Sequence, residues 1–170
     1  MTPKARYSWP FLLILFMTDC TTKELVVNRL PEVARLHPGA ESFVRLRLAH
    51  NAGTAFGFDL QQYIGSWARP TLVLGMVIVL AVLFRIYSAA APRTRLAAAG
   101  LGLACGGAIG NIVDRLRFSA GVVDFIDVGI GAHRFWTFNV ADAGITVGAT
   151  LLALALWRKD TVESRARSVA

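Results

Sequence analysis

Two aspartates in apolar surroundings are the residues of this sequence best suited to chemistry. Asp124 lies in VVDF and Asp142 ends FNVAD, and neither has a basic neighbour in its local sequence. Two partly desolvated carboxyls placed close together share a proton, so that one acts as a base and the other as an acid. Such a pair can activate a water molecule for attack on a peptide carbonyl and protonate the departing amine.

Asp142 is the better candidate for the ionised partner. It is expected in the first turn of a helix, where the helix macrodipole favours a negative charge. The shared proton nevertheless belongs to the pair as a whole.

Further polar side chains interrupt apolar stretches or flank them. An ionisable group inside a membrane costs about 2.5 to 3.5 kcal/mol on insertion scales, so each needs a reason. Asparagines can instead simply join helices by hydrogen bonds, for about 0.6 kcal/mol each. Asp19 with Lys23, and Asp114 with Arg115, can likewise form structural ion pairs. For these groups, structural and functional interpretations both stay open. The set is Asp19, Lys23, Asn51, Asn111, Asp114, Arg115 and Asn139.

The composition is that of an integral membrane protein. Of the 170 residues, 55% are hydrophobic and only 17% are charged, and the mean hydropathy is +0.51. At 1.5 Å per residue, about 20 residues cross a hydrocarbon core about 30 Å thick. We therefore predict one α-helical membrane domain, residues 1–170, with four transmembrane helices. Their ranges are 8–27, 70–91, 96–114 and 138–157, and the long outer connections are 28–69 and 115–137.

The distribution of basic residues predicts the orientation. Each side of the membrane receives nine Lys and Arg residues, but those beside the termini lie on shorter segments. By the positive-inside rule, both termini are cytoplasmic. The polar groups then gather at one depth, near the outer leaflet. Alternating Val44, Leu46 and Leu48 predict a half-buried strand in a small outer β-sheet, and residues 119–135 are expected along the membrane interface.

Several other functions and sites are disfavoured. The net charge of +7 comes from residues at segment ends and not from one phosphate-binding face, so we expect no nucleic acid partner. His37, His50 and His133 are scattered, and we expect no metal or cofactor. Cys20 and Cys105 are expected to be packing residues. Asp19 before Cys20 disfavours a cleaved lipoprotein signal, which needs a small residue there, so the first helix is expected to be retained.

Five motifs in register carry a resemblance to a known family. They are D-x-x-T-K (Asp19–Lys23), N-x-G-x-A-F (Asn51–Phe56), GG-x-x-GN-x-x-DR (Gly106–Arg115), VVDF (Val122–Phe125) and FN-x-AD-x-x-I-T (Phe138–Thr146). With them, the chain resembles the bacterial lipoprotein signal peptidases, or signal peptidase II, over nearly its whole length. Cys20 and Thr54 depart from the usual residues of these motifs, but neither replaces a catalytic group.

The resemblance implies a four-helix aspartyl endopeptidase of the bacterial inner membrane, with a periplasmic β-cradle over its site. It implies that Asp124 and Asp142 are catalytic. It also gives functional roles to Asp19, Lys23, Asn51, Gly53, Asn111, Arg115 and Asn139. The implied substrates are diacylglyceryl-modified prolipoproteins, cut on the amino side of the lipidated cysteine. Globomycin-like cyclic peptides are expected to occupy the site.

Two other classes of protein compete with a peptidase. A proton-coupled transporter would use the aspartates as a relay, but a relay should continue inward, and the inner halves of the predicted spans lack such groups apart from Arg85. A structural protein without enzymatic activity would use the aspartates only to join its helices by hydrogen bonds. We expect a monomer, although the spacing of Gly102, Gly106 and Gly110 is compatible with packing within or between chains.

Overall fold

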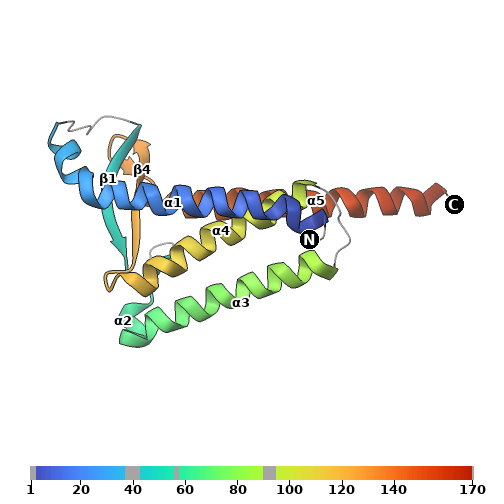
Figure 1. The fold of residues 1–170 in the computed structure, drawn as a ribbon, viewed down its shortest axis with the longest axis horizontal. Helices are drawn as coiled ribbons and strands as arrows, with labels where there is room; N and C mark the ends of the chain where they lie inside the picture. Colours follow the sequence, from blue (N-terminus) through green and yellow to red (C-terminus); the bar gives the residue numbers. More distant parts are fainter. Residues whose placement is uncertain (1–2, 37–42, 56–57, 90–94, 170) are drawn as a thin grey trace.

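The computed structural model describes residues 3–36, 43–55, 58–89 and 95–169. Long helices dominate it, namely α1 (Pro3–Leu36), α3 (Ala68–Ala89), α4 (Arg95–Arg117) and α5 (Val140–Val169). A short helix α2 (Gln61–Ile64) and a 3₁₀ turn η1 (Gly65–Trp67) precede α3. A small sheet caps one end of the bundle, and both chain ends lie toward the other (Figure 1).

Two helical segments are long and apolar enough to cross a membrane, Gln61–Arg85 and Arg95–Arg117. The apolar part of α5, Val140–Ala155, is shorter, and α1 carries the charged groups Asp19, Lys23 and Glu24 in its middle. The described helices thus include two candidate spans, and four membrane crossings remain a prediction.

The helix ends differ from those predicted by hydropathy alone. We expected 8–27 and 138–157, but α1 runs from Pro3 to Leu36 and α5 from Val140 to Val169. The reason is that apolar length marks the membrane core and not the end of the helix. After Trp157 the sequence RKDTVESRARSV contains neither glycine nor proline, so nothing in it terminates the helix.

Helix α4 lies at the centre of the bundle, because its small residues allow close approach on two sides. A Cβ on Gly106 would lie 2.6 Å from the Leu12 carbonyl oxygen of α1. On another face, Gly100 of α4 meets Gly148 of α5 backbone to backbone. The glycine row 102, 106 and 110 therefore faces α1 of the same chain, which decides between the two alternatives for these residues.

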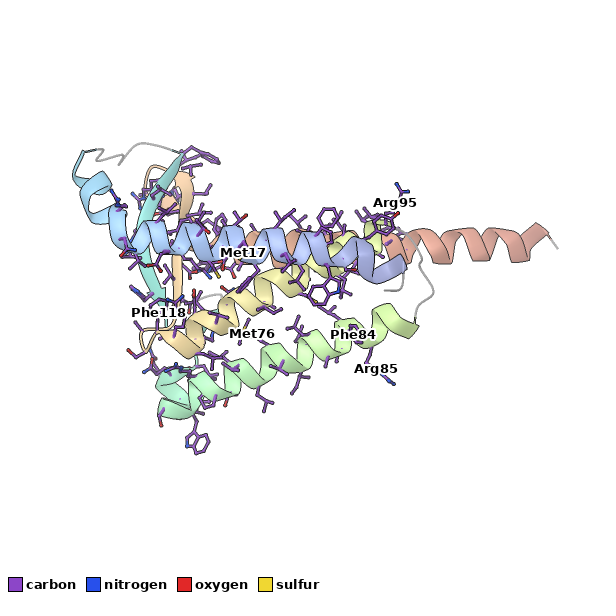
Figure 2. All side chains as sticks on the ribbon, in the orientation of Figure 1. Met17, Met76, Phe84, Arg85, Arg95 and Phe118 are labelled. Carbon is purple, nitrogen blue, oxygen red and sulfur yellow. The ribbon has the colours of Figure 1, made fainter. Side chains whose placement is uncertain are left out.

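Helix α3 has little protein around it. It packs mainly against α4, and only 6% of its candidate span is buried, against 61% of the α4 span. Figure 2 shows α3 as the outlying helix, bearing Met76 and Phe84. Its apolar surface suits contact with lipid. Arg85 and Arg95 lie at the end away from the sheet, whereas Phe118 lies at the sheet end (Figure 2).

The three-stranded sheet has the order β1-β4-β5 and is antiparallel. Strand β1 (Val44–Asn51) confirms the predicted strand. Its neighbours are β4 (Val122–Ile130) and β5 (His133–Arg134), while β2 (Thr54–Ala55) and β3 (Phe58–Asp59) form a separate pair. The register places Ala49 opposite Asp124.

The structure adds to one expectation about this region and corrects another. Residues 119–135, expected along the membrane interface, contain β4, the central strand, because VVDFIDV is rich in β-branched residues that suit a sheet. In β1, the apolar Val44 and Leu46 are about half exposed, while Arg45 is partly covered. Val44 and Leu46 therefore turn away from the protein core, whereas Leu48, at the register shift between Leu46 and Ala49, packs against the core cluster of Val26 and Phe125.

Candidate active site

The first turn of α5 holds Asp142 in a reciprocal capping arrangement. The side-chain oxygen of Asn139, the residue before the helix, accepts the Asp142 backbone N–H at 2.8 Å. In return, Oδ2 of Asp142 accepts the Asn139 backbone N–H at 3.3 Å. This is the capping-box geometry, with aspartate at the third helical position. It fixes the Asp142 carboxylate at the N-terminus of the helix.

The same asparagine reaches the second aspartate. Nδ2 of Asn139 donates to Oδ1 of Asp124 at 2.7 Å and to the Val123 carbonyl at 3.3 Å. Asn139 is fully buried. One side-chain amide therefore ties Asp124 on β4 to Asp142 on α5, and the structure brings the two predicted catalytic residues together.

Asp124 is buried, and its carboxyl holds a proton more tightly than an ordinary aspartate does. Burial, followed by the charge of Asp142, raises the pKa of Asp124 to about 7. Hydrogen bonds from Asn51 and Asn139 work in the opposite direction. The two carboxyls of the pair are thus inequivalent, since Asp142 is the one held at a helix N-terminus.

Asn51 is oriented toward Asp124 by its own turn. Its side-chain oxygen accepts the Gly53 backbone N–H at 3.0 Å, which leaves its amide nitrogen as the donor for Asp124. Gly53 has φ = 151°, and a Cβ there would meet Leu72 Cδ1 at 3.0 Å. The glycine of the N-x-G motif therefore serves backbone conformation and close packing.

Lys23 is the centre of a buried polar cluster behind the aspartates. Its ammonium lies 2.7 Å from Asp19 Oδ2, 2.8 Å from Asp114 Oδ2 and 2.9 Å from Asn111 Oδ1. The predicted Asp19–Lys23 pair is confirmed. Asp114 pairs with Lys23 and not with Arg115, because α1 and α4 bring these groups together across the bundle, which adjacency in sequence cannot reveal.

The two carboxylates bound to Lys23 also hold the strands and helices that carry the aspartate pair. Oδ1 of Asp19 accepts the Ala141 N–H of α5 at 2.9 Å. Oδ2 of Asp114 accepts the Val123 N–H of β4 at 3.2 Å. Each carboxylate therefore fixes the backbone next to one member of the pair, Asp142 or Asp124.

Asn111 connects Lys23 to Asp142 through hydrogen bonds of its side-chain amide. Its side-chain oxygen accepts from Lys23 and, at 3.2 Å, from Asn139, so its Nδ2 faces Asp142 and donates to Oδ1 at 2.8 Å. The ammonium sets the orientation of this amide, since only the oxygen can accept from it. Asp142 thus receives hydrogen bonds from Asn111 and from the Asn139 backbone.

A pocket of about 800 Å³ opens in front of the pair. Asn51, Asp124 and Asp142 line it together with Arg115, whose Nη1 donates weakly to the Asn111 carbonyl at 3.4 Å. Nε of Arg115 is buried and has no hydrogen-bond partner among the described residues. The pocket thus combines two carboxyls and a guanidinium with a mainly apolar lining.

Two parts of this region were not predicted from the sequence. Phe135 and Trp136 line the pocket, and Asp127, almost fully buried, binds Arg45 at 2.6 Å and Arg134 at 2.8 Å. A signal for the first was the aromatic run FWTF directly before Asn139. The Asp127 cluster joins β1, β4 and β5, and its partners are 82 and 7 residues away.

No group of three or more His, Cys, Asp and Glu side chains in the described part of the chain is arranged to hold a metal ion. The site holds two carboxyls joined by Asn139 beside an open pocket, and the pKa of one of them, Asp124, is raised to about 7. Such a pair can act as a general base and a general acid on a bound water molecule and a carbonyl.

Comparison with known proteins identifies the family of this chain. Residues 11–158 match the family described as signal peptidase (SPase) II. A lipoprotein signal peptidase of Oleidesulfovibrio alaskensis is 34% identical over 93% of this chain and 99% of its own. One from Burkholderia vietnamiensis is 42% identical over 113 residues, so that the match spans 65% of this chain and 64% of the relative.

A solved structure has the same fold. It is described as a bacterial membrane enzyme determined by the in meso method, and it superposes with a TM-score of 0.67 at 26% identity, covering 90% of this chain and 88% of its own. A second such structure, at 23% identity and a TM-score of 0.64, matches in fold. The chain is therefore similar to membrane-embedded enzymes.

Proposed function

The chain belongs to the signal peptidase II family, and we propose that it is an aspartic endopeptidase acting on prolipoproteins. It removes the signal peptide on the amino side of a diacylglyceryl-modified cysteine. The observation that carries the proposal is the Asp124–Asp142 pair, joined by Asn139 and open to a pocket.

The first half of the reaction uses the inequality of the two carboxyls. Asp142 enters ionised and Asp124 protonated, because burial and the charge of Asp142 raise the pKa of Asp124 to about 7. Asp142 takes a proton from water as the water oxygen bonds to the scissile carbonyl carbon. Asp124 gives its proton to the carbonyl oxygen, and a tetrahedral gem-diol forms.

The second half returns the protons. Asp142 donates the proton it took to the amide nitrogen, and the carbon–nitrogen bond breaks. The gem-diol returns a proton to Asp124 as the carboxyl group of the signal peptide forms. The products are the signal peptide and a lipidated cysteine with a free amino group, and Asp124 and Asp142 are back in their starting states.

The remaining polar residues position this pair or bind the substrate. Asn51, Asn111 and Asn139 orient the carboxyls, while Asp19 and Lys23 hold the structure behind them. Arg115 lines the pocket, and in this proposal its guanidinium binds a substrate carbonyl next to the scissile bond. Gly53 preserves the turn of Asn51.

We propose that the enzyme is a monomer of the bacterial inner membrane, with four crossings and both termini in the cytoplasm. Strand β4, which carries Asp124, lies at the end of the bundle away from both chain ends (Figure 1). In this orientation the site is near the periplasmic face, where water is available. A cyclic peptide such as globomycin would bind in the same pocket.

The test uses purified protein in detergent and two forms of one prolipoprotein, with and without the diacylglyceryl group. Mass spectrometry in H₂¹⁸O locates the cut and the new carboxyl. The proposal predicts cleavage before the lipidated cysteine, with ¹⁸O in the signal peptide. Equal cleavage of the unmodified protein, or no cleavage of either, would overturn it.

A further inference from the structure

The outer wall of the pocket is a short segment that returns from the sheet to α5. The Phe135 N–H donates to the Val128 carbonyl at 2.7 Å, and the Phe138 N–H donates to the Ile126 carbonyl at 3.0 Å. Both ends of the segment 135–138 are thus held against β4. Trp136 and Thr137 lie between these two points, and both line the pocket.

The side chains of this wall form a row of aromatic rings. Phe135 and Trp136 meet edge to face, with ring centroids 5.2 Å apart and an interplanar angle of 68°. Phe135 also meets Phe138 at 6.2 Å and 79°. Such contacts support one another, yet Phe135 and Trp136 remain 57% and 54% exposed. The rings therefore present an apolar surface that the protein itself does not cover.

This surface stands beside the reacting groups. The segment ends at Asn139, which binds both aspartates, and the same pocket is lined on its α5 side by Ile145 and Val147. The pocket thus has a polar centre between an aromatic wall outside the helical bundle and an aliphatic wall on a helix.

The substrate of the proposed reaction carries a matching group. A peptide bond and a water molecule occupy only the polar centre of the pocket. The diacylglyceryl group is attached to the cysteine that follows the scissile bond. Its glyceryl ester groups lie at the membrane interface, the depth that tryptophan prefers because its ring is apolar and its N–H polar. The aromatic wall lies off the N-terminus of α5, at the sheet end of the bundle.

We infer that Trp136, supported by Phe135, binds the diacylglyceryl group of the substrate and sets the preference for a lipidated cysteine. This inference rests on the proposed function and gives that site its specificity element. Trp136 acts in binding, and the aspartates perform the chemistry.

A contact experiment tests the inference directly. Trp9, Trp67 and Trp157 are replaced by Phe, so that Trp136 is the one tryptophan left. The probe is a lipopeptide with a reduced, uncleavable scissile bond and acyl chains brominated near the esters. Bromine quenches indole fluorescence on contact, so quenching should saturate with probe. A matched protein retaining only Trp67 should show only the quenching given by brominated phospholipid. Trp67 is also exposed, and it lies in η1 between α2 and α3, at the sheet end of the fold (Figure 1).

Kinetics provide a second and independent test. Trp136→Leu should lower kcat/KM for the lipidated prolipoprotein about tenfold, equivalent to about 1.4 kcal/mol, chiefly through KM. Trp136→Phe should keep most of the activity, and Trp67→Leu should match wild type. The advantage of long over short acyl chains should shrink in Trp136→Leu.

The outcomes separate this inference from the proposed function. If wild type cleaves the lipidated substrate, but Trp136 is not saturably quenched by bound probe, the inference is wrong and the peptidase assignment stands. An equal loss for Trp136→Leu with all acyl lengths would also overturn it, because the ring would then serve only the fold or peptide binding. If wild type cleaves nothing, the proposed function itself fails.

Discussion

Asn139 donates a 2.7 Å hydrogen bond to Oδ1 of Asp124 from the same side-chain amide whose oxygen caps the helix at Asp142. One buried side chain therefore connects strand β4 and helix α5 at the reacting groups. Because the two functions use different atoms of Asn139, they can be separated by substitution.

Asn139→Ser should keep the helix cap, since serine is a good N-cap residue, but lose the donor to Asp124. We expect nearly wild-type thermal stability and a loss of kcat of at least about 100-fold, the lower range for misplaced acid–base groups. Asn139→Ala should lose the activity and also about 1 kcal/mol of stability. Melting curves and cleavage rates measure both. Full activity of Asn139→Ser would show that the bridge to Asp124 is dispensable.

The pH dependence of cleavage should report the protonation of Asp124. Since burial and Asp142 raise the pKa of Asp124 to about 7, kcat/KM should fall as pH rises above about 7, when the acid is lost. Asn51 lowers that pKa by its hydrogen bond, so Asn51→Ala should move the alkaline limb to higher pH while reducing the rate. A limb that stays in place would contradict this assignment.

The raised pKa of Asp124 should also make the free energy of unfolding depend on pH. A carboxyl whose folded pKa is raised binds more protons in the folded state, so the free energy of unfolding should fall as pH rises from about 4 to about 7. Asp124→Asn should remove this slope. Unfolding in detergent at several pH values measures it, and an unchanged slope in the variant would assign it to another group.

Lys23→Met should be among the most damaging single substitutions. It leaves Asp19 and Asp114 buried without the ammonium that lies 2.7 and 2.8 Å from them, and breaking a buried ion pair costs about 3 to 5 kcal/mol. Adding Asp114→Asn should restore part of the stability. Glu24→Gln, on the exposed neighbour, is the control. A fully stable Lys23→Met protein would show that the cluster contributes little.

The Asp127 cluster should stabilise the sheet in a pH-dependent manner. Burial raises the pKa of Asp127, but hydrogen bonds from Arg45 and Arg134 outweigh it, so the pKa of Asp127 is lowered. The stabilisation is present above the unfolded value and is lost as pH falls through the folded one. The melting temperature should fall less steeply below about pH 4 in Asp127→Asn than in wild type. An equally steep fall in the variant and in wild type would contradict a stabilising role of the ionised Asp127.

Several features of the site were predictable because they depend on residue type alone. Asp124 and Asp142 stand out as acids in apolar surroundings, and Asp19 and Lys23 share a helix face by spacing. The partner of Asp114 was not predictable, since Lys23 lies 91 positions earlier and meets it only when α1 packs on α4. The place of Phe135 and Trp136 in the pocket was not predictable, because no local pattern reveals that hydrogen bonds to β4 hold this segment beside the aspartates.

The sheet was only partly predictable for a related reason. Period-two alternation identified β1, but Val44 and Leu46 face outward and Arg45 binds Asp127. Exposed apolar side chains are common in folded proteins, since much of their accessible surface is apolar. Alternation therefore predicted the strand, but its apolar side faces the core only at Leu48, next to the register shift between Leu46 and Ala49.

The decisive measurement is cleavage of a diacylglyceryl-modified prolipoprotein by wild type, Asp124→Asn and Asp142→Asn, with Glu24→Gln as the carboxylate control and melting curves for all four. An aspartate pair at the centre of the chemistry predicts that both Asp→Asn variants stay folded and lose cleavage, while Glu24→Gln cuts normally. Normal cleavage by either folded Asp→Asn variant would contradict it.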